Sequence, residues 1–530
     1  MASEAVLPAL APSARRAQWS KWLITISVLL GAMMGAVDSS VVNVALAHIQ
    51  ASYGVTTQEV TWVTTSYLIA LVIIMPLTAW LGSVLGRRRM FLTAIAIFTG
   101  ASLLCGLSRT LGQLIAFRVL QGLGGGVLQP SAQAIMRETF PPEEQAQAQG
   151  IFGMILLLGP AIGPTLGGWL TDNYSWPWIF FVNLPIGVGA LLMGARFIVD
   201  PPYMTRRALR RIDGIGIGLM ALGLAALQVL LEEGETDGWF QSSFIVGVTV
   251  VCILALAAFV IWELRIDEPA VDLRIFRNVS FASGAFIGGV MGLAMFGGLI
   301  LLPLFFQTLL GYDATQAGLT LMPRSAVMVF MMPLAGLLYN RLGPYVMLPF
   351  GLTMAGVSGL MMTRFTLDSG RVQLVLPLLI QGTGFAFMFV GLSTTTLSTI
   401  PRRMMQNAAG MFTLMFQLGG SLGTALIITI LDHKITTASA NLSKYASIYN
   451  PSFTGWWKAY EAWFLSRGSD AATAHRQALA ALQQIINQQS AVVAFDYAFG
   501  VIAGVFFLCL PLVLLLRRGR AQAEEPAAIA

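Results

Sequence analysis

The sequence contains little charge and few reactive side chains. Only 11% of its 530 residues are charged, against roughly 25% in soluble domains, whereas 56% are hydrophobic. Its three cysteines, Cys105, Cys252 and Cys509, each lie in an apolar run without a partner at disulfide or metal-site spacing, so we expect small core residues. Its three histidines form no metal-ligand pair. No cluster of nucleophile, base or metal ligands therefore indicates an enzyme.

Long apolar runs recur along almost the whole chain. Each has about 20 residues, enough to cross the roughly 30 Å hydrocarbon core of a bilayer as a helix, and lipid requires backbone groups to bond within their own segment. We therefore predict an all-α polytopic membrane protein. About fourteen spans are expected, at residues 22–47, 58–81, 90–107, 112–136, 147–170, 177–198, 213–231, 241–263, 280–309, 315–339, 345–363, 373–398, 408–431 and 492–516.

The first run has some features of a signal peptide. Basic residues precede it, and ALA at 45–47 resembles a cleavage site. The run is too long for that role and contains Asp38, which favours an uncleaved first span.

The net charge of +6 is explained by orientation rather than by nucleic-acid binding. With the N-terminus inside, about 21 of the 31 Lys and Arg residues fall on cytoplasmic segments, as the positive-inside rule predicts. The acidic run EEGETD at 232–237 falls outside. Both termini are then cytoplasmic.

The chain contains an internal repeat. LQGLGGG at 120–126 aligns with IQGTGFA at 380–386, and LGPAIGP at 158–164 aligns with LGGSLGT at 418–424, both at an offset of 260. This predicts two six-helix halves separated by an extra hairpin, an arrangement typical of transporters that move two halves around a central site. The predicted segments are a tail at 1–21, halves at 22–198 and 280–516, the hairpin and its loops at 199–279, and a tail at 517–530.

Two charges are expected to meet inside the membrane. Asp38 lies about 24 Å along the first span from Trp22, and Arg118 lies at a similar depth in the fourth span. Burial and a nearby cation act in opposite directions on the proton affinity of a carboxylate, so Asp38 is a candidate proton carrier with Arg118 as its partner. For Asp38 the alternatives are a static ion pair or a helix end at the surface. For Arg118 the alternative is an arginine that packs helices by bonding backbone carbonyls.

Other patterns give weaker site predictions. Arg324 and Asp496 are further charges within predicted spans, although Asp496 is shallow enough to reach the interface.

Glycines four residues apart make a smooth helix face, and prolines between them bend the helix, so the fifth span is either a flexing contact or a kinked, tightly packed helix. The motif comprises Gly159, Pro160, Gly163, Pro164, Gly167 and Gly168. GIGIGLMALG at 214–223 lacks a preceding strand and a Walker lysine, which excludes a nucleotide loop.

The soluble segment at 432–491 lies on the outer side, between the last two spans. Its aromatic part, YNPSFTGWWKAYEAWF, precedes an Ala- and Gln-rich stretch with helical character. It is either a docking surface or an ordinary connection of unusual length.

These motifs resemble the fourteen-span drug:proton antiporters of the major facilitator superfamily. VDSSVVNVALAHI resembles the first-span motif with Asp38, FRVLQGLGGG the fourth-span motif with Arg118, and GPAIGPTLGG the antiporter motif. The loop after the second span retains Gly86, Arg87 and Arg88 of a cytoplasmic gating loop. Ser83 replaces the usual aspartate there and Asn340 occupies the second copy, which puts a gate built on that aspartate in doubt.

The resemblance implies export of amphipathic drugs in exchange for protons across the bacterial inner membrane, with no cofactor besides the proton gradient. In Gram-negative relatives it also implies a periplasmic adaptor, through residues 432–491, and an outer-membrane channel. A metabolite or lipid exporter of the same fold and a non-transporting receptor or scaffold are the alternatives.

Adaptable Met and Phe side chains suit varied cargo. We place Asn43, Gln129, Met295, Phe296, Phe412 and Phe416 on the substrate cavity, although each is equally compatible with core or lipid contacts.

Overall fold

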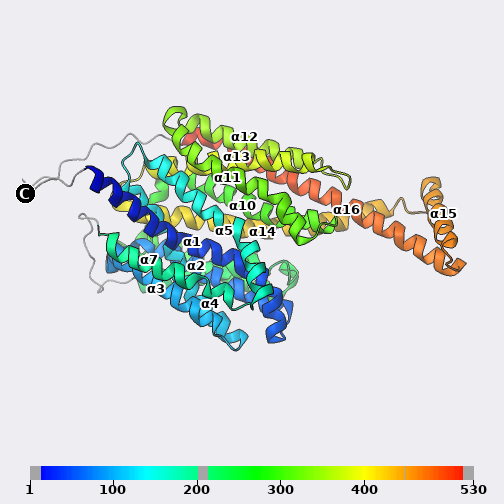
Figure 1. The fold of residues 1–530 in the computed structure, drawn as a ribbon, viewed down its shortest axis with the longest axis horizontal. Helices are drawn as coiled ribbons and strands as arrows, with labels where there is room; N and C mark the ends of the chain where they lie inside the picture. Colours follow the sequence, from blue (N-terminus) through cyan, green and yellow to red (C-terminus); the bar gives the residue numbers. More distant parts are fainter. Residues whose placement is uncertain (1–13, 201–212, 448, 517–530) are drawn as a thin grey trace, which may run out of the picture. The chain divides into compact units, whose positions relative to one another are not determined.

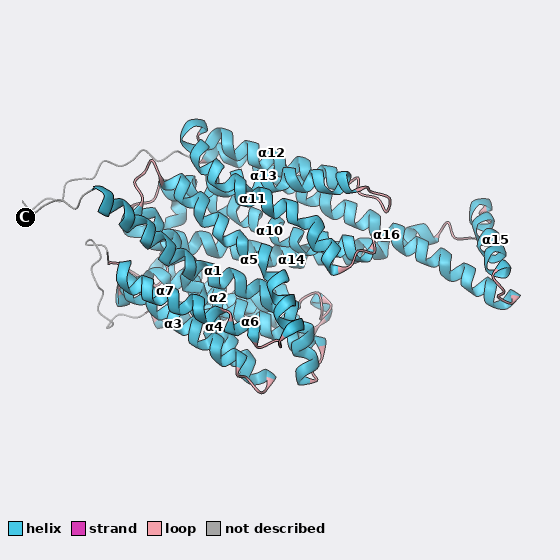
Figure 2. Cartoon of the chain, in the orientation of Figure 1, coloured by secondary structure: helices cyan, strands magenta, loops and turns pink. Residues whose placement is uncertain are grey.

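The computed structural model describes residues 14–200, 213–447 and 449–516, and in these ranges it contains helices and no strand (Figure 2). Fourteen helical segments are long and apolar enough to cross a membrane, which confirms the predicted number of spans. The helices are α1 (Ala14–Tyr53), α2 (Thr57–Leu85), α3 (Arg87–Gly106), α4 (Leu111–Thr139), α5 (Gln145–Asn173), α6 (Trp178–Phe181), α7 (Asn183–Phe197), α8 (Gly214–Glu233), α9 (Ser243–Arg265), α10 (Val279–Thr308), α11 (Ala314–Leu342), α12 (Pro344–Met362), α13 (Arg371–Ser398), α14 (Met405–Ser443), α15 (Pro451–Ser466) and α16 (Ala471–Cys509).

Two helices extend well beyond the predicted spans. α14 and α16 each have 39 residues, so most of the segment predicted as a connection at 432–491 is helical. The helical character expected for its Ala- and Gln-rich part is confirmed, because that part forms the beginning of α16. α15 lies between the two long helices along the chain and packs against α16 (Figure 1).

The sixth span consists of two pieces, α6 and α7, joined at Val182. Pro185 lies in the first turn of α7, where its missing N–H removes no helical hydrogen bond. A continuous helix would need an N–H from residue 185 to reach residue 181, so the helix restarts here. The restart places Asn183 at the first position of α7.

The turns before α2 and α11 have the same construction in both halves. Thr56 accepts a hydrogen bond from the backbone N–H of Glu59, and Asp313 accepts one from that of Gln316, 257 residues later. Glycines with φ of +65° and +67°, Gly54 and Gly311, precede the two caps. The shared turn geometry supports the internal repeat.

Helix contacts divide the described chain into two units. The first contains the described residues up to Ala221, with Ile261–Asp272 and Ile400–Thr413. The second contains Leu222–Val260, Leu273–Thr399 and the described residues from Leu414 onward. This division differs from the segments predicted at 22–198, 199–279 and 280–516, which remain a prediction. In the first unit, α1 packs against α4, α5 and α7, and α4 packs against α2 and α3 (Figure 1).

Candidate functional site

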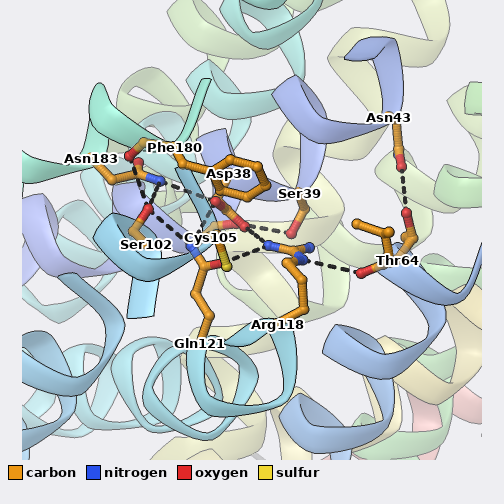
Figure 3. Close-up of polar contacts among 12 residues, drawn as sticks. Asp38, Ser39, Asn43, Thr64, Ser102, Cys105, Arg118, Gln121, Phe180 and Asn183 are labelled. Atoms are coloured by element: carbon orange, nitrogen blue, oxygen red, sulfur yellow. Dashed lines mark hydrogen bonds and ion pairs between the residues drawn. The ribbon is translucent and has the colours of Figure 1, made fainter. Parts of the chain in front are cut away.

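The two intramembrane charges singled out in the sequence form a buried ion pair in the first unit. Nη1 of Arg118, on α4, lies 2.6 Å from Oδ2 of Asp38, on α1, and both side chains are 0% exposed. The two residues thus contact each other, while their depth in the membrane and their part in proton transfer remain predictions. The pair lies where α1, α2, α4 and α7 meet (Figure 3).

Side-chain amides complete the surroundings of the carboxylate. Nε2 of Gln121 donates to Asp38 Oδ1 at 2.8 Å, and Nδ2 of Asn183 donates to the same oxygen at 3.0 Å. Both amides also reach the hydroxyl of Ser102, at 3.2 and 3.1 Å, and this hydroxyl donates to the carbonyl of Phe180. Asp38 thus accepts three hydrogen bonds from protein groups, which offset the loss of water around a buried charge.

The guanidinium has contacts of several kinds. Besides the carboxylate, Arg118 donates through Nε to the carbonyl of Val63 at 3.1 Å and through Nη1 to Oε1 of Gln121 at 2.8 Å. Its Cζ lies 4.1 Å from the centre of the Tyr67 ring, a cation–π contact. Arg118 therefore bonds a backbone carbonyl on α2 as well as Asp38, so it holds helices together in addition to pairing with the acid.

The network retains unused hydrogen-bonding capacity. Among the described residues, Arg118 Nη2, Asn183 Oδ1 and the Tyr67 hydroxyl are buried without a partner. An acceptor and donors are therefore available if the carboxylate gains a proton and its bond to Arg118 weakens.

Sequence reasoning missed the amides and the hydroxyl. Gln121 follows Arg118 by three residues, one helical turn, so it shares the face of α4 that carries the arginine. A polar residue one turn from an intramembrane charge is a usable signal. Asn183 and Ser102 offered none, because each is an isolated polar residue on another span.

The glycine motif on α5 contacts α1 directly. A Cβ added at Gly159 would lie 2.6 Å from the backbone carbon of Ala36, and one at Gly167 would lie 3.0 Å from the carbonyl oxygen of Val41. Gly163 packs on the side chain of Ser40, whereas Gly168 has open space. Of the two prolines in the motif, Pro160 lies within the helix and Pro164 is exposed. The glycines therefore allow close packing onto the helix that carries Asp38.

The gating-loop residues join α2 and α3. Gly86 has φ of +81°, a conformation that favours glycine. Arg87 is buried and pairs with Glu138 of α4, and the backbone N–H of Arg88 donates to Asp200 at 2.7 Å. Ser83, at the place of the usual aspartate, donates to the carbonyl of Trp80 in its own helix.

The remaining predicted charges lie on separate helices. Arg324 on α11 is 5% exposed. Asp496 on α16 is half-buried, and its Oδ1 has no hydrogen-bond partner in the described part of the chain. Both residues belong to the second unit, whereas the Asp38 network belongs to the first.

The predicted cavity residues occupy varied surroundings. Met295 and Phe412 are buried, Gln129 is half-buried and Asn43 is exposed. The rings of Phe296 and Phe416 contact each other with centroids 6.0 Å apart. The second unit contains a cavity of about 490 Å³ between α10, α14 and α16, and its lining residues differ from the six predicted ones. Its lining residues include Leu304, Thr308, Leu431, Gln484, Asn487 and Phe495.

Comparison with known proteins gives the family. A sequence model of the Major Facilitator Superfamily matches residues 28–424. The multidrug export protein EmrB of Escherichia coli (strain K12) is 32% identical over 493 residues, which cover 93% of this chain and 94% of that protein. The fatty acid resistance protein FarB of Neisseria gonorrhoeae is 29% identical, over 93% of this chain and 96% of that protein.

Solved structures share the fold. The human organic anion transporter MFSD10 has a TM-score of 0.59 at 14% identity, covering 95% of this chain and 100% of its own. The proton:xylose symporter XylE has a TM-score of 0.58 at 13% identity, covering 93% of this chain and 95% of its own. At such identities the likeness concerns the fold alone. Together with the sequence matches and the fourteen apolar helices, it shows that this chain belongs to the Major Facilitator Superfamily and is a multi-pass membrane transporter, not an enzyme.

Proposed function

We propose that this protein exports amphipathic drugs or toxic compounds in exchange for protons. The observation that carries the proposal is the fully buried pair of Asp38 and Arg118, held by amides and accompanied by polar atoms without a partner among the described residues. A charge at membrane depth is costly and is usually retained for a function. Similarity to EmrB, a multidrug export protein, supports drugs as the cargo.

The proposed cycle uses alternating access. In the outward-facing state Asp38 takes a proton from the external side as the drug leaves, and the protonated protein returns to the inward-facing state. There the proton leaves, the bond to Arg118 re-forms and a new drug molecule binds. Protonation removes the charge that Arg118 pairs with, so the two states differ in the free energy of this pair, as coupling requires.

We further propose the inner membrane of a bacterium as the location, with both termini in the cytoplasm. This orientation follows from the distribution of Lys and Arg. It places α15 and the ends of α14 and α16 nearest to it on the outer side, where a periplasmic adaptor of an outer-membrane channel could dock. Exposed aromatic side chains, including Trp456 and Trp463 on α15, supply a contact surface.

Export from proteoliposomes under an imposed pH gradient tests the proposal. We expect Asp38→Asn to reduce gradient-driven export of a fluorescent amphipathic drug at least about tenfold, because its amide cannot exchange a proton. Asp172→Asn is the matched control, since that carboxylate is 71% exposed near the end of α5, and it should retain export. Undiminished export by Asp38→Asn overturns the role of this carboxylate, and absence of gradient-driven export in the wild type overturns the proposed function.

The adaptor is tested separately. Removal of α15 with a short linker between the long helices should abolish copurification of a periplasmic partner, while export from proteoliposomes persists. A partner retained by the trimmed protein would contradict docking at this segment.

A further inference from the structure

The second unit contains a buried arginine without an acidic partner. Arg324 on α11 is 5% exposed and lies within a membrane span. In the described part of the chain, no carboxylate forms an ion pair with it, and its guanidinium packs on the ring of Phe385 on α13, with Cζ 5.3 Å from the ring centre. An unpaired charge at this depth is costly, so a permanent cation here calls for an anion from elsewhere.

The internal repeat shows which residue of the first half occupies the position equivalent to Arg324. A Cβ at Gly122 would lie 2.5 Å from the carbonyl oxygen of Tyr67, and one at Gly382, 260 residues later, would lie 2.6 Å from that of Arg324. The same helix crossing thus occurs in both halves, with Arg324 at the place of Tyr67. In the first half this place holds the ring that covers a guanidinium, and in the second half it holds the guanidinium itself.

Of two neighbouring positions, one differs between the halves and the other carries glutamine in both. Gly125 lies against the Tyr67 hydroxyl, 2.9 Å from an added Cβ, and its counterpart Phe385 carries the ring that stacks on Arg324. Gln121 donates to Asp38, whereas Oε1 of its counterpart Gln381 is buried without a partner among the described residues. The second half therefore contains a guanidinium, an aromatic ring and an amide. Among the described residues it has no carboxylate paired with this guanidinium, as Asp38 is paired with Arg118 in the first half.

The guanidinium lies next to a glycine on the neighbouring helix. Nη1 of Arg324 lies 3.7 Å from the point where a Cβ would stand at Gly298 on α10. Apart from the chain neighbours Gly297 and Leu299 and the adjoining backbone of α10, no other described group comes within 4 Å of that point. Glycine thus leaves open a position from which an acid group could reach Arg324.

We propose that Arg324 binds the acidic group of the cargo, and that the transported compounds include amphipathic organic carboxylates. This inference rests on the proposed function, because the ligand is the exported molecule. The guanidinium presents a planar, forked set of donors that matches a carboxylate, and its contact with the Phe385 ring leaves these donors without an acidic partner among the described residues. The apolar part of the ligand then lies among hydrophobic side chains of the same unit.

Binding of two isosteric probes tests the site. Titration of the purified full-length protein, in detergent with zwitterionic lipid, should show 2-naphthoate binding at least about tenfold more tightly than 2-naphthamide. Arg324→Gln should abolish this preference by weakening naphthoate binding alone. Arg371→Gln, which removes an exposed cation at the start of α13, is the matched control and should keep the preference.

A second variant tests the open position and avoids an unpaired buried charge. Gly298→Asp supplies an internal carboxylate next to Arg324, so it should abolish the naphthoate preference and leave naphthamide binding unchanged, whereas Gly298→Asn should retain part of the preference. Equal affinities of the wild type for both probes, or an unaltered preference in Arg324→Gln or Gly298→Asp, overturn the inference. A repeat of the titration with added phosphatidylglycerol separates a lipid headgroup from cargo, and phosphatidylglycerol that naphthoate fails to displace also overturns the inference.

The two proposals fail separately. A wild type that prefers naphthoate but shows no gradient-driven export loses the proposed function and keeps the anion site. One that exports drugs on a pH gradient without any naphthoate preference loses only the anion site.

Discussion

At the scale of single residues, the carboxylate of Asp38 and the guanidinium of Arg118 balance each other. Asp38 accepts bonds from three side chains, and Arg118 also bonds a backbone carbonyl. Removing one charge leaves the other buried without compensation, whereas removing both leaves polar and apolar groups of similar shape. The pair therefore constrains which variants stay folded.

A double-mutant cycle measures this constraint. Asp38→Asn alone should lower the free energy of unfolding by about 3 kcal/mol or more, and Arg118→Met alone by a similar amount. The double variant should be less destabilised than the sum of the two, because neither charge is then left unpaired. Thermal unfolding in detergent, followed by tryptophan fluorescence, gives the values, and strict additivity would show that the two side chains do not interact.

The meeting of these two residues could be predicted from the sequence, but their full surroundings could not. Helical rise gives depth, so two opposite charges at equal depth were expected to pair. Which spans adjoin is decided by packing between helices far apart in the chain. Asn183, for example, reaches Asp38 from the start of α7, a position set by the break in the sixth span at Val182.

At the scale of elements, the contact of α5 with α1 depends on glycines that have no room for a side chain. Gly159→Ala should destabilise the protein by about 1–3 kcal/mol, because its methyl group would clash with backbone atoms of Ala36 and force the helices apart. The unfolding temperature in detergent measures the effect.

Gly168→Ala, on the same helix, is the control for this substitution. An added methyl group at Gly168 meets open space, so it causes no clash. Alanine also has less backbone freedom than glycine in the unfolded chain, which favours the folded helix slightly. We therefore expect an unchanged or slightly raised unfolding temperature, and equal unfolding temperatures for the two variants would contradict the packing argument.

The start of α16 gives a prediction about pH. Asp470 lies outside the spans and caps this helix, and its bonds with the hydroxyl and the backbone N–H of Thr473 hold the pKa of its carboxyl below the ordinary value. Because the folded pKa is the lower one, the cap contributes stability above the unfolded pKa and loses it as the pH falls through the folded pKa. Amide hydrogen exchange at residues 471–474, corrected for its intrinsic pH dependence, should therefore lose protection at acidic pH. Asp470→Ala should remove this effect, and an unchanged profile in that variant would contradict the capping role.

The extent of the long helices could not be read from hydropathy. The windows at 408–431 and 492–516 record only the apolar parts, whereas α14 and α16 continue through polar residues. The polar residues of both helices are supported by helix propensity, and those of α16 also by packing of α15, neither of which produces an apolar run.

At the scale of the whole molecule, the two halves repeat the helix crossings but not the charges. A guanidinium is paired with a carboxylate in the first half, and in the second half Arg324 has none among the described residues. The repeat was visible in the sequence because glycines mark the crossings. The exchange of Tyr67 for Arg324 was not, because only the structure shows that the two occupy equivalent places.

The charge of the cargo changes the electrical work of the proposed exchange. One proton moving inward across 100 mV supplies about 2.3 kcal/mol, enough for about a fiftyfold gradient of a neutral compound. Outward movement of a carboxylate adds a second charge, so about 4.6 kcal/mol and roughly a two-thousandfold gradient become available.

Proteoliposomes with a potassium diffusion potential test this difference. Accumulation of 2-naphthoate should depend on voltage about twice as steeply, on a logarithmic scale, as that of 2-naphthamide. Equal voltage dependence for the two probes would show that the acid is not carried as an anion.

The length of α14 and α16 also has a mechanical consequence. At 39 residues each, they are about 58 Å long, nearly twice the thickness of the hydrocarbon core. A rigid rod of this length moves its far end by about 1 Å for each degree of tilt about the other end. If these helices tilt during transport, we expect the end that carries α15 to move farther than their membrane-spanning parts, and a spin label at α15 would measure this movement.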